Sequence, residues 1–546
     1  MSFIDDYKSY KIYTDTYTDW REENSLREAK RQEFLRKNPT AIKDYDIQRS
    51  KVLLRAVDIM YKESDNSEIN TLLSSTLDLG LEYATVGGTA LGFLCTKLKF
   101  VKNFIDKLVK HNPKAKNIIP TAITALSGVA GIMAAIPIYD YISGSKDEID
   151  RKNQFVALEK ELSDPRIFVV LDSEQEKQFK HNVENLEEPQ KRIQPIKTLK
   201  KSYKAVKEIP HEILKRKNEI KNYEDKYFIP EELFNKELTN DEIKNAKKDQ
   251  YLLTNLVRKI NTKAQSYQEK ISGITNTLIT MSFALGSLLT LGYERLAKHF
   301  KWKASAIPAG LGIYSMLATT FLAAKAEKRA VEVGKFKTKQ ELMEHPEQLV
   351  YISDKKTGEI KDVEIPEEMV PKKTNKLKFL KEFWQTNKEY EKWKKDKSLS
   401  GKELSKALEN INFSDEQIKD GKRLQNNMFR TFYTIDKNAE RYSTDITAIG
   451  QTLQYLITLA LGSTGSVLGM KYLAKLRTAK APKEIVEQTL KYIGTTLLFA
   501  MPSLVINDAI LKERKRSARI SDMLTIQELS DYKIYADYSR FSNQKE

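Results

Sequence analysis

The chain has 546 residues, a formal net charge of +17 and one cysteine. This length exceeds that of an ordinary domain and predicts two to four units. The single cysteine, Cys95, excludes a disulfide framework and a cysteine metal site, which fits a reducing compartment. The basic residues are mostly lysines interleaved with acids, a pattern that favours solvated or lipid-facing charge and makes nucleic acid an unexpected partner.

Six largely uncharged runs interrupt this charged chain, and they come in three pairs. Each run approaches the roughly 20 residues that a helix needs to cross a bilayer. The central pair is the clearest, because a short basic link joins Ile271–Tyr293 to Ala304–Ala324. The first run reaches the required length only if Asp78 and Glu82 lie at the membrane interface or face other helices. The predicted spans are residues 77–96 (approximate bounds), 117–139, 271–293, 304–324, 446–470 and 492–510.

Similar sequences before the hairpins favour a threefold internal repeat. LTNDEIKNAKKDQ precedes the second hairpin and FSDEQIKDGKRLQ precedes the third. Each phrase begins with a predicted capping box, in which a side chain at the helix start and one three residues later satisfy free backbone N–H groups. The two pairs are Thr239 with Glu242 and Ser414 with Gln417.

Similar sequences also follow the hairpins, as ELSDP (161–165), ELMEHP (341–346) and ELSDY (528–532). The phrase YKIY occurs near both ends of the chain, at residues 10–13 and 532–535. A period this long has to be tested by matching residues in order, and these matches favour three equivalent units. The predicted units are residues 1–171, 172–352 and 353–546.

The polar regions read as long amphipathic helices with a few short strands. No proline interrupts Thr239–Tyr293, so one helix of roughly 80 Å is expected there. The short apolar run Ile167–Leu171 predicts a strand, and DKKTG between two alternating runs predicts a hairpin turn at residues 354–358. The two YKIY phrases are expected as neighbouring strands. The predicted fold is therefore an α-dominated membrane protein with six hydrophobic helices in three hairpins.

Small residues at four-residue spacing within the spans predict close helix packing in lipid. These pairs are Gly88 with Gly92, Ser282 with Gly286, and Gly465 with Gly469. Acidic residues at span ends are the candidate functional groups, because a carboxylate inside a membrane span is usually functional. An interfacial position is the alternative explanation for all four of them, Asp78, Glu82, Asp140 and Asp508.

No catalytic, cofactor or metal motif is recognisable. The five histidines lie in different segments without a carboxylate at metal-ligand spacing. No phosphate-binding loop, dinucleotide fingerprint or nucleophile elbow is present in the sequence. We therefore expect a non-enzymatic protein without a cofactor.

Three functions fit this pattern. The first is a membrane-anchored or membrane-shaping scaffold, with anionic lipids at the basic links and a possible protein partner on the extramembrane helices. The second is a six-span transporter or channel with pseudo-threefold symmetry. The third is a soluble helical protein that buries three hydrophobic hairpins. We favour the scaffold, in an integral membrane location with cytoplasmic polar regions, because more than half of the chain lies outside the predicted spans.

Overall fold

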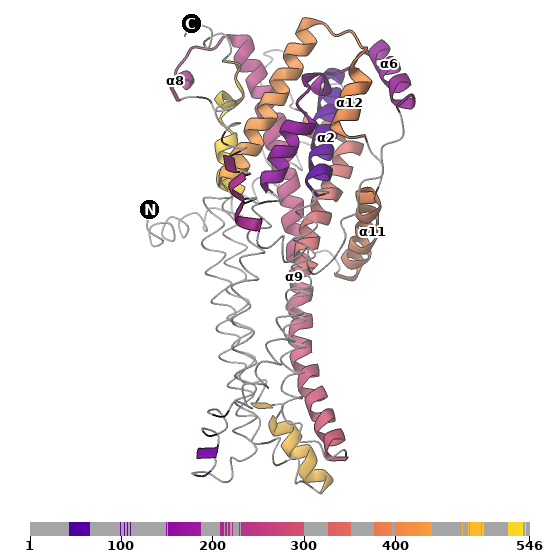
Figure 1. Ribbon diagram of the computed structural model, residues 1–546, viewed down its shortest axis with the longest axis vertical. Helices are drawn as coiled ribbons and strands as arrows, with labels where there is room; N and C mark the ends of the chain where they lie inside the picture. Colours follow the sequence, from indigo (N-terminus) through magenta and orange to yellow (C-terminus); the bar gives the residue numbers. More distant parts are fainter. Residues whose placement is uncertain are drawn as a thin grey trace, which may run out of the picture.

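Three long helices form the centre of the fold in the computed structural model (Figure 1). They are α2 (Asp44–Asp65), α9 (Asn240–His299) and a helix at residues 415–438. Shorter helices at residues 151–161, 326–344 and 522–529 pack beside them. The structure describes residues 43–65, 151–186, 231–299, 326–350, 376–395, 399–438, 481–492 and 522–538, with isolated positions between these ranges.

Capping boxes begin two of the three long helices, as the sequence predicted. At the start of α9, the Glu242 backbone N–H donates to Thr239 Oγ1 at 3.3 Å, and the Thr239 N–H donates to the Glu242 carboxylate at 2.7 Å. The corresponding distances for Ser414 and Gln417 are 3.2 and 2.9 Å. Each box satisfies two of the backbone donors that a helix start leaves free. Both predicted boxes are confirmed.

The unbroken helix expected after Thr239 is also confirmed. α9 contains 60 residues without interruption. At a rise of about 1.5 Å per residue it is roughly 90 Å long. Its C-terminal half extends beyond the other labelled helices in Figure 1.

A 3₁₀ turn begins at the last residue of each of the three phrases ELSDP, ELMEHP and ELSDY. These turns are η3 (Pro165–Phe168), η4 (Pro346–Leu349) and η5 (Tyr532–Tyr535). An aspartate caps two of them, because Asp164 accepts from the Arg166 N–H at 3.0 Å and Asp531 accepts from the Lys533 N–H at 2.9 Å. Proline occupies the first position of η3 and η4, where its missing N–H carries no penalty.

Each 3₁₀ turn lies against a different pair of the long helices. η4 contacts α2 and α9. η5 contacts α9, and its backbone also accepts hydrogen bonds from Asn427 and Arg430 in the helix at 415–438. η3 contacts α2 and approaches Gly421 of that same helix. The three turns therefore fill the three seams of the central bundle.

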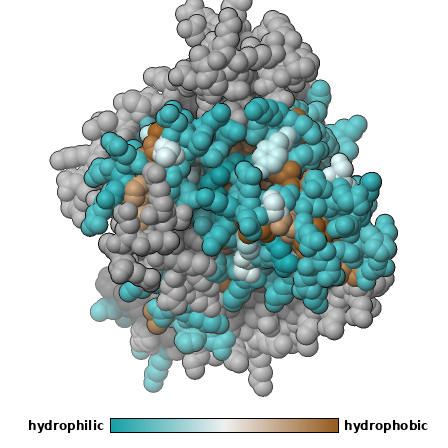
Figure 2. Space-filling model, turned by 90° about the horizontal axis from the view of Figure 1, so that it is seen from above, coloured by the Kyte–Doolittle hydropathy of each residue, from teal (hydrophilic) through white to brown (hydrophobic). Residues whose placement is uncertain are grey.

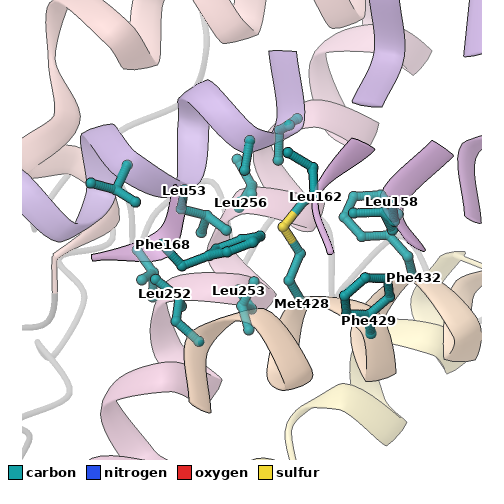
Figure 3. Close-up of a cluster of buried hydrophobic side chains, with 14 of the residues drawn as sticks. Leu53, Leu158, Leu162, Phe168, Leu252, Leu253, Leu256, Met428, Phe429 and Phe432 are labelled. Atoms are coloured by element: carbon teal, nitrogen blue, oxygen red, sulfur yellow. The ribbon is translucent and has the colours of Figure 1, made fainter. Parts of the chain in front are cut away.

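The main hydrophobic core lies where these turns and helices meet (Figure 3). Phe168 of η3 points into the cluster between Leu53 of α2 and Met428, and it is 1% exposed. Nearby, the rings of Phe155 and Phe429 meet edge to face with 6.1 Å between their centroids. Sequence-distant segments thus share one core.

A smaller cluster attaches α11 (Lys376–Lys395) to α9 and to residues 326–344. The Tyr267 and Phe379 rings meet edge to face at 5.3 Å, and Lys339 Nζ lies 3.7 Å from the centre of the Trp393 ring. The Trp393 indole also donates to Asp58 of α2 at 3.0 Å. Aromatic and cation–π contacts therefore dominate this attachment.

Two glycines of this region provide a matched pair for testing helix packing. A Cβ on Gly334 would lie 2.8 Å from Ala264 Cα of α9, whereas a Cβ on Gly273 would meet no atom within 4 Å. Gly334→Ala is therefore expected to destabilise the protein by about 1–3 kcal/mol. Gly273→Ala should stabilise it by about 0.5–1 kcal/mol, because alanine favours helix. Urea unfolding of both variants checks this opposite pair of signs.

The membrane architecture predicted from the sequence is wrong. Among the residues that the structure describes, no helix combines the length and the apolar character needed to cross a bilayer. The span predicted at 271–293 lies within α9, where serine, threonine, asparagine and glycine make up almost half of the run. Its first residue, Ile271, packs against protein side chains of residues 326–344 and is 5% exposed. The structure therefore does not support the membrane and transport assignments or the integral membrane location.

The other predicted spans lie almost entirely outside the described residues. Spans 77–96, 117–139, 304–324 and 446–470 lie outside the described residues, as does nearly all of 492–510. The division into units 1–171, 172–352 and 353–546 stays a prediction.

The predicted strands are also wrong, and the described residues contain no strand. The segment expected as a strand at Ile167–Leu171 begins in η3, and the second YKIY phrase forms η5. An aspartate cap begins each of these turns, and burial of one aromatic side chain holds each turn in place. The proposed hairpin at 354–358 and the first YKIY phrase lie outside the described residues.

Candidate functional site

Two polar arrangements stand out in the bundle, and the first is a buried ionic centre. Its middle is Asp249 of α9, which is fully buried. One Asp249 oxygen accepts from Arg49 of α2, and the other accepts from Arg423 Nε at 3.1 Å and from Asn427 Nδ2 at 2.8 Å. Asp420 pairs with Arg423 and lies 3.5 Å from Arg49 Nε. The centre thus joins all three long helices.

The arginines of this centre keep the buried Asp249 carboxylate ionised. Burial raises the pKa of Asp249, but Arg49 and Arg423 more than reverse this effect, so its pKa is below the ordinary aspartate value. At the edge of the centre, the Tyr45 hydroxyl donates to Asp420 at 2.7 Å, and its pKa is raised by burial and by that carboxylate. The Asp249 oxygens are engaged and inaccessible, which suits a structural joint between helices.

The second arrangement is a groove on the outside of the bundle. It is bounded by α2, η3, α6 (Ser173–Glu184) and α12 (Gly401–Leu408), and its volume is about 210 Å³. Its floor is apolar and is made of Val52, Ile167, Phe179, Leu404 and Leu408.

Basic side chains outnumber acidic ones in the lining of the groove. Lys51 and Arg55 come from α2, Arg166 from η3 and Lys180 from α6, against one carboxylate, Glu176. Lys51 and Arg55 are four residues apart, so they lie on the same face of α2. Arg166 also binds Asp164, with 2.7 Å between Nη2 and Oδ2, and Lys180 pairs with Glu176 at 2.9 Å. The lining therefore carries a positive surplus on an apolar floor.

Local hydrogen bonds hold the walls of the groove in place. α6 begins with a capping box in which Asp172 accepts from the Gln175 N–H at 2.9 Å. The Gln175 side chain donates to the Asn412 carbonyl at 2.7 Å, and Asn182 donates to the Ala407 carbonyl at 2.8 Å. Because side chains of α6 bind the backbone at and beyond α12, the two walls are fixed relative to each other.

The surface of the bundle is mostly hydrophilic on one face (Figure 2). Figure 2 shows one face of the bundle, on which hydrophilic side chains predominate and hydrophobic ones occur as small patches between them. An apolar floor with charged edges is the usual construction of a protein-binding surface.

The structure describes none of the side chains that were predicted as functional. Asp78, Glu82, Asp140 and Asp508 lie outside the described residues, as do the glycine pairs Gly88–Gly92 and Gly465–Gly469. Ser282 and Gly286 are part of α9, but the structure describes only their backbone.

Sequence reasoning missed both arrangements, although each left a signal. Asp249 and Arg49 each stand four residues before a fully buried leucine, Leu253 and Leu53 respectively. A charged residue on the core face of a helix indicates a buried pair with another element. The signal for the groove was weaker, because Lys51 and Arg55 resemble ordinary solvated charges.

Comparison of the chain with protein families, with curated proteins and with solved structures finds no match.

Proposed function

We propose that the protein is a non-enzymatic helical scaffold that binds an acidic, amphipathic segment of a protein partner in the groove between α2, η3, α6 and α12. The observation that carries this proposal is the lining of the groove, which combines an apolar floor with four basic side chains and one carboxylate. A helix with an apolar face and acidic flanks has the complementary chemistry.

The size of the groove favours a partner side chain over a small molecule. Sites for cofactors and small ligands usually enclose about 300–1,000 Å³. The groove has about 210 Å³, which suits one or two large apolar side chains from a longer segment. Such buried anchors typically supply most of the affinity of a protein interface.

The charges at the rim favour an acidic segment. Lys51 and Arg55 project from consecutive turns of α2, so two carboxylates one helical turn apart can face them together. Charges of this kind increase the association rate and select the partner, and salt weakens their effect.

The ionic centre supports a scaffold in another way. Its charged groups pair with one another across α2, α9 and the helix at 415–438, and Asp249 is inaccessible to a substrate. Their chemistry thus serves to join helices. A rigid bundle presents a groove of constant shape, which lowers the entropy lost on binding.

A peptide titration tests the proposal. The probe is a labelled helical peptide of about five turns with leucine and phenylalanine on one face and glutamate on its flanks. We expect it to bind the full chain, and we expect Lys51→Glu combined with Arg55→Glu to weaken binding by at least about tenfold, roughly 1.4 kcal/mol. Fluorescence anisotropy gives the Kd, which should rise with salt concentration.

Two controls make this result specific. Lys392→Glu reverses an exposed charge on α11, outside the groove, and should leave the Kd unchanged. A peptide with lysine in place of glutamate should bind poorly. Equal binding of the acidic and basic peptides, or wild-type affinity of the double variant, would refute the proposed function.

A further inference from the structure

The second YKIY phrase, residues 532–535, lies in the seam between α9 and the helix at 415–438, and side chains of both helices form a cradle around it. Tyr535 is fully buried, and its hydroxyl lies 3.5 Å from Thr254 Oγ1 of α9. Thr254 Oγ1 also donates to the Leu529 carbonyl, just before η5, at 3.0 Å. The tyrosine at the end of the phrase is thus its main anchor.

The opposite wall of the cradle binds the backbone of the phrase. Asn427 Nδ2 donates to the Tyr535 carbonyl at 3.1 Å. Arg430 Nη1 donates to the Ile534 carbonyl at 3.2 Å and to the Ala536 carbonyl at 3.3 Å. Contacts to carbonyl groups are available to any segment that adopts the same turn.

The side chains around the turn supply further selectivity. Lys247 Nζ of α9 lies 5.5 Å from the centre of the Tyr532 ring, which allows a cation–π contact. Lys533 Nζ donates to the Phe234 carbonyl of α8 (Glu231–Phe234) at 3.0 Å. Together these contacts recognise a tyrosine, a lysine and a second tyrosine at fixed spacing.

The chain carries a second copy of this motif near its N-terminus. Tyr10–Asp15 reads YKIYTD, and Tyr532–Asp537 reads YKIYAD. Asp531 caps η5, and the equivalent Ser9 is also a residue type that caps helical turns. The one difference within the motif is Thr14 in place of Ala536, which is 1% exposed, so the N-terminal copy should fit the cradle less tightly.

We propose that the seam between α9 and residues 415–438 is a binding site for Tyr-Lys-Ile-Tyr-x-Asp segments, and that Tyr10–Asp15 is its second ligand. The C-terminal copy holds the seam in the structure, because its alanine, Ala536, fits better than Thr14. The N-terminal copy binds the same seam when the C-terminal copy is weakened. This inference is independent of the groove and of the proposed function.

A double-mutant cycle in the full chain tests this competition. Tyr13→Ala alone should leave the Tm unchanged, because the C-terminal copy holds the seam. Tyr535→Ala should lower the Tm, and adding Tyr13→Ala should lower it by at least about 3 °C more. Tyr17→Ala, outside the motif, is the matched control and should have no effect in the Tyr535→Ala chain. If Tyr535→Ala does not fold, Tyr535→Leu permits the same cycle.

A peptide with the sequence of residues 8–17 provides a second readout. It should raise the Tm of the Tyr13→Ala, Tyr535→Ala chain, and the same peptide with alanine at the position of Tyr13 should not. Sedimentation of the Tyr535→Ala chain distinguishes binding within one molecule, which leaves a monomer, from exchange between two copies. Strict additivity of the two substitutions, together with no effect of the peptide, would overturn the proposal.

Discussion

Asp249→Asn is expected to lower the free energy of unfolding by about 3–5 kcal/mol. The substitution keeps the size of the side chain but removes the negative charge between Arg49 and Arg423. Arg49 is 4% exposed and would remain buried near only one carboxylate, Asp420, at 3.5 Å. A buried charge without an adequate counterion is strongly destabilising, and urea unfolding at neutral pH measures the loss.

The matched control removes both charges together. Combining Asp249→Leu with Arg49→Met replaces the pair by apolar side chains, and such replacements are often neutral or stabilising. We therefore expect the combined variant to be more stable than Asp249→Asn. A combined variant that is less stable would contradict the view that an unbalanced charge causes the loss.

The effect of Asp249 should also depend on pH. Its pKa in the folded protein is lowered, because Arg49 and Arg423 outweigh the effect of burial. The stability from this shift is present above the unfolded aspartate pKa of about 3.9, and it is lost as the pH falls through the folded pKa. The difference between wild type and Asp249→Asn should thus be constant from pH 7 to 5 and shrink below about pH 4.

Phe168→Ala is expected to destabilise the protein by about 3–5 kcal/mol. Phe168 is 1% exposed and its ring lies in the main core between α2, α9 and the helix at 415–438 (Figure 3). Truncation leaves a cavity, and η3 cannot move to fill it because Gly421 lies directly against Pro165 and Val169. Chemical denaturation followed by far-UV circular dichroism gives the value.

An exposed aromatic residue serves as the comparison for Phe168. Trp384 of α11 is 62% exposed, and Trp384→Ala should change the free energy of unfolding by less than about 0.5 kcal/mol. Similar losses for the two variants would mean that η3 is not part of the cooperative core.

Local sequence signals predicted part of the fold correctly. The capping boxes at Thr239 and Ser414 require only two side chains at fixed spacing, so they could be read without knowledge of the tertiary structure. The length of α9 followed from the absence of proline over a long helical pattern. Such features depend on neighbouring residues and are therefore accessible from one sequence.

Features that depend on tertiary packing were predicted wrongly. Ile167–Leu171 has the composition of a strand, but Asp164 and Pro165 begin a turn and Phe168 enters the core. Similarly, the lack of charge in the run at 271–293 predicts a membrane span, although Ile271 packs against other helices of the protein. Uncharged residues fit a protein interior as well as lipid.

The ionic centre could not be predicted from the sequence for a related reason. Arg49 is 200 residues from Asp249 in sequence, and Arg423 is 174 residues from Asp249. The groove likewise requires α2, η3, α6 and α12 to meet. No spacing rule within one segment predicts such an assembly.

Hydrogen exchange of the full chain, with and without the acidic amphipathic peptide, tests the proposed scaffold function most directly. The proposal predicts slower exchange in α6, η3 and α12, with no change in α11. In the Lys51→Glu, Arg55→Glu chain this protection should disappear. Protection confined to other helices, or protection that persists in the double variant, would contradict the assignment of the groove as the partner-binding site.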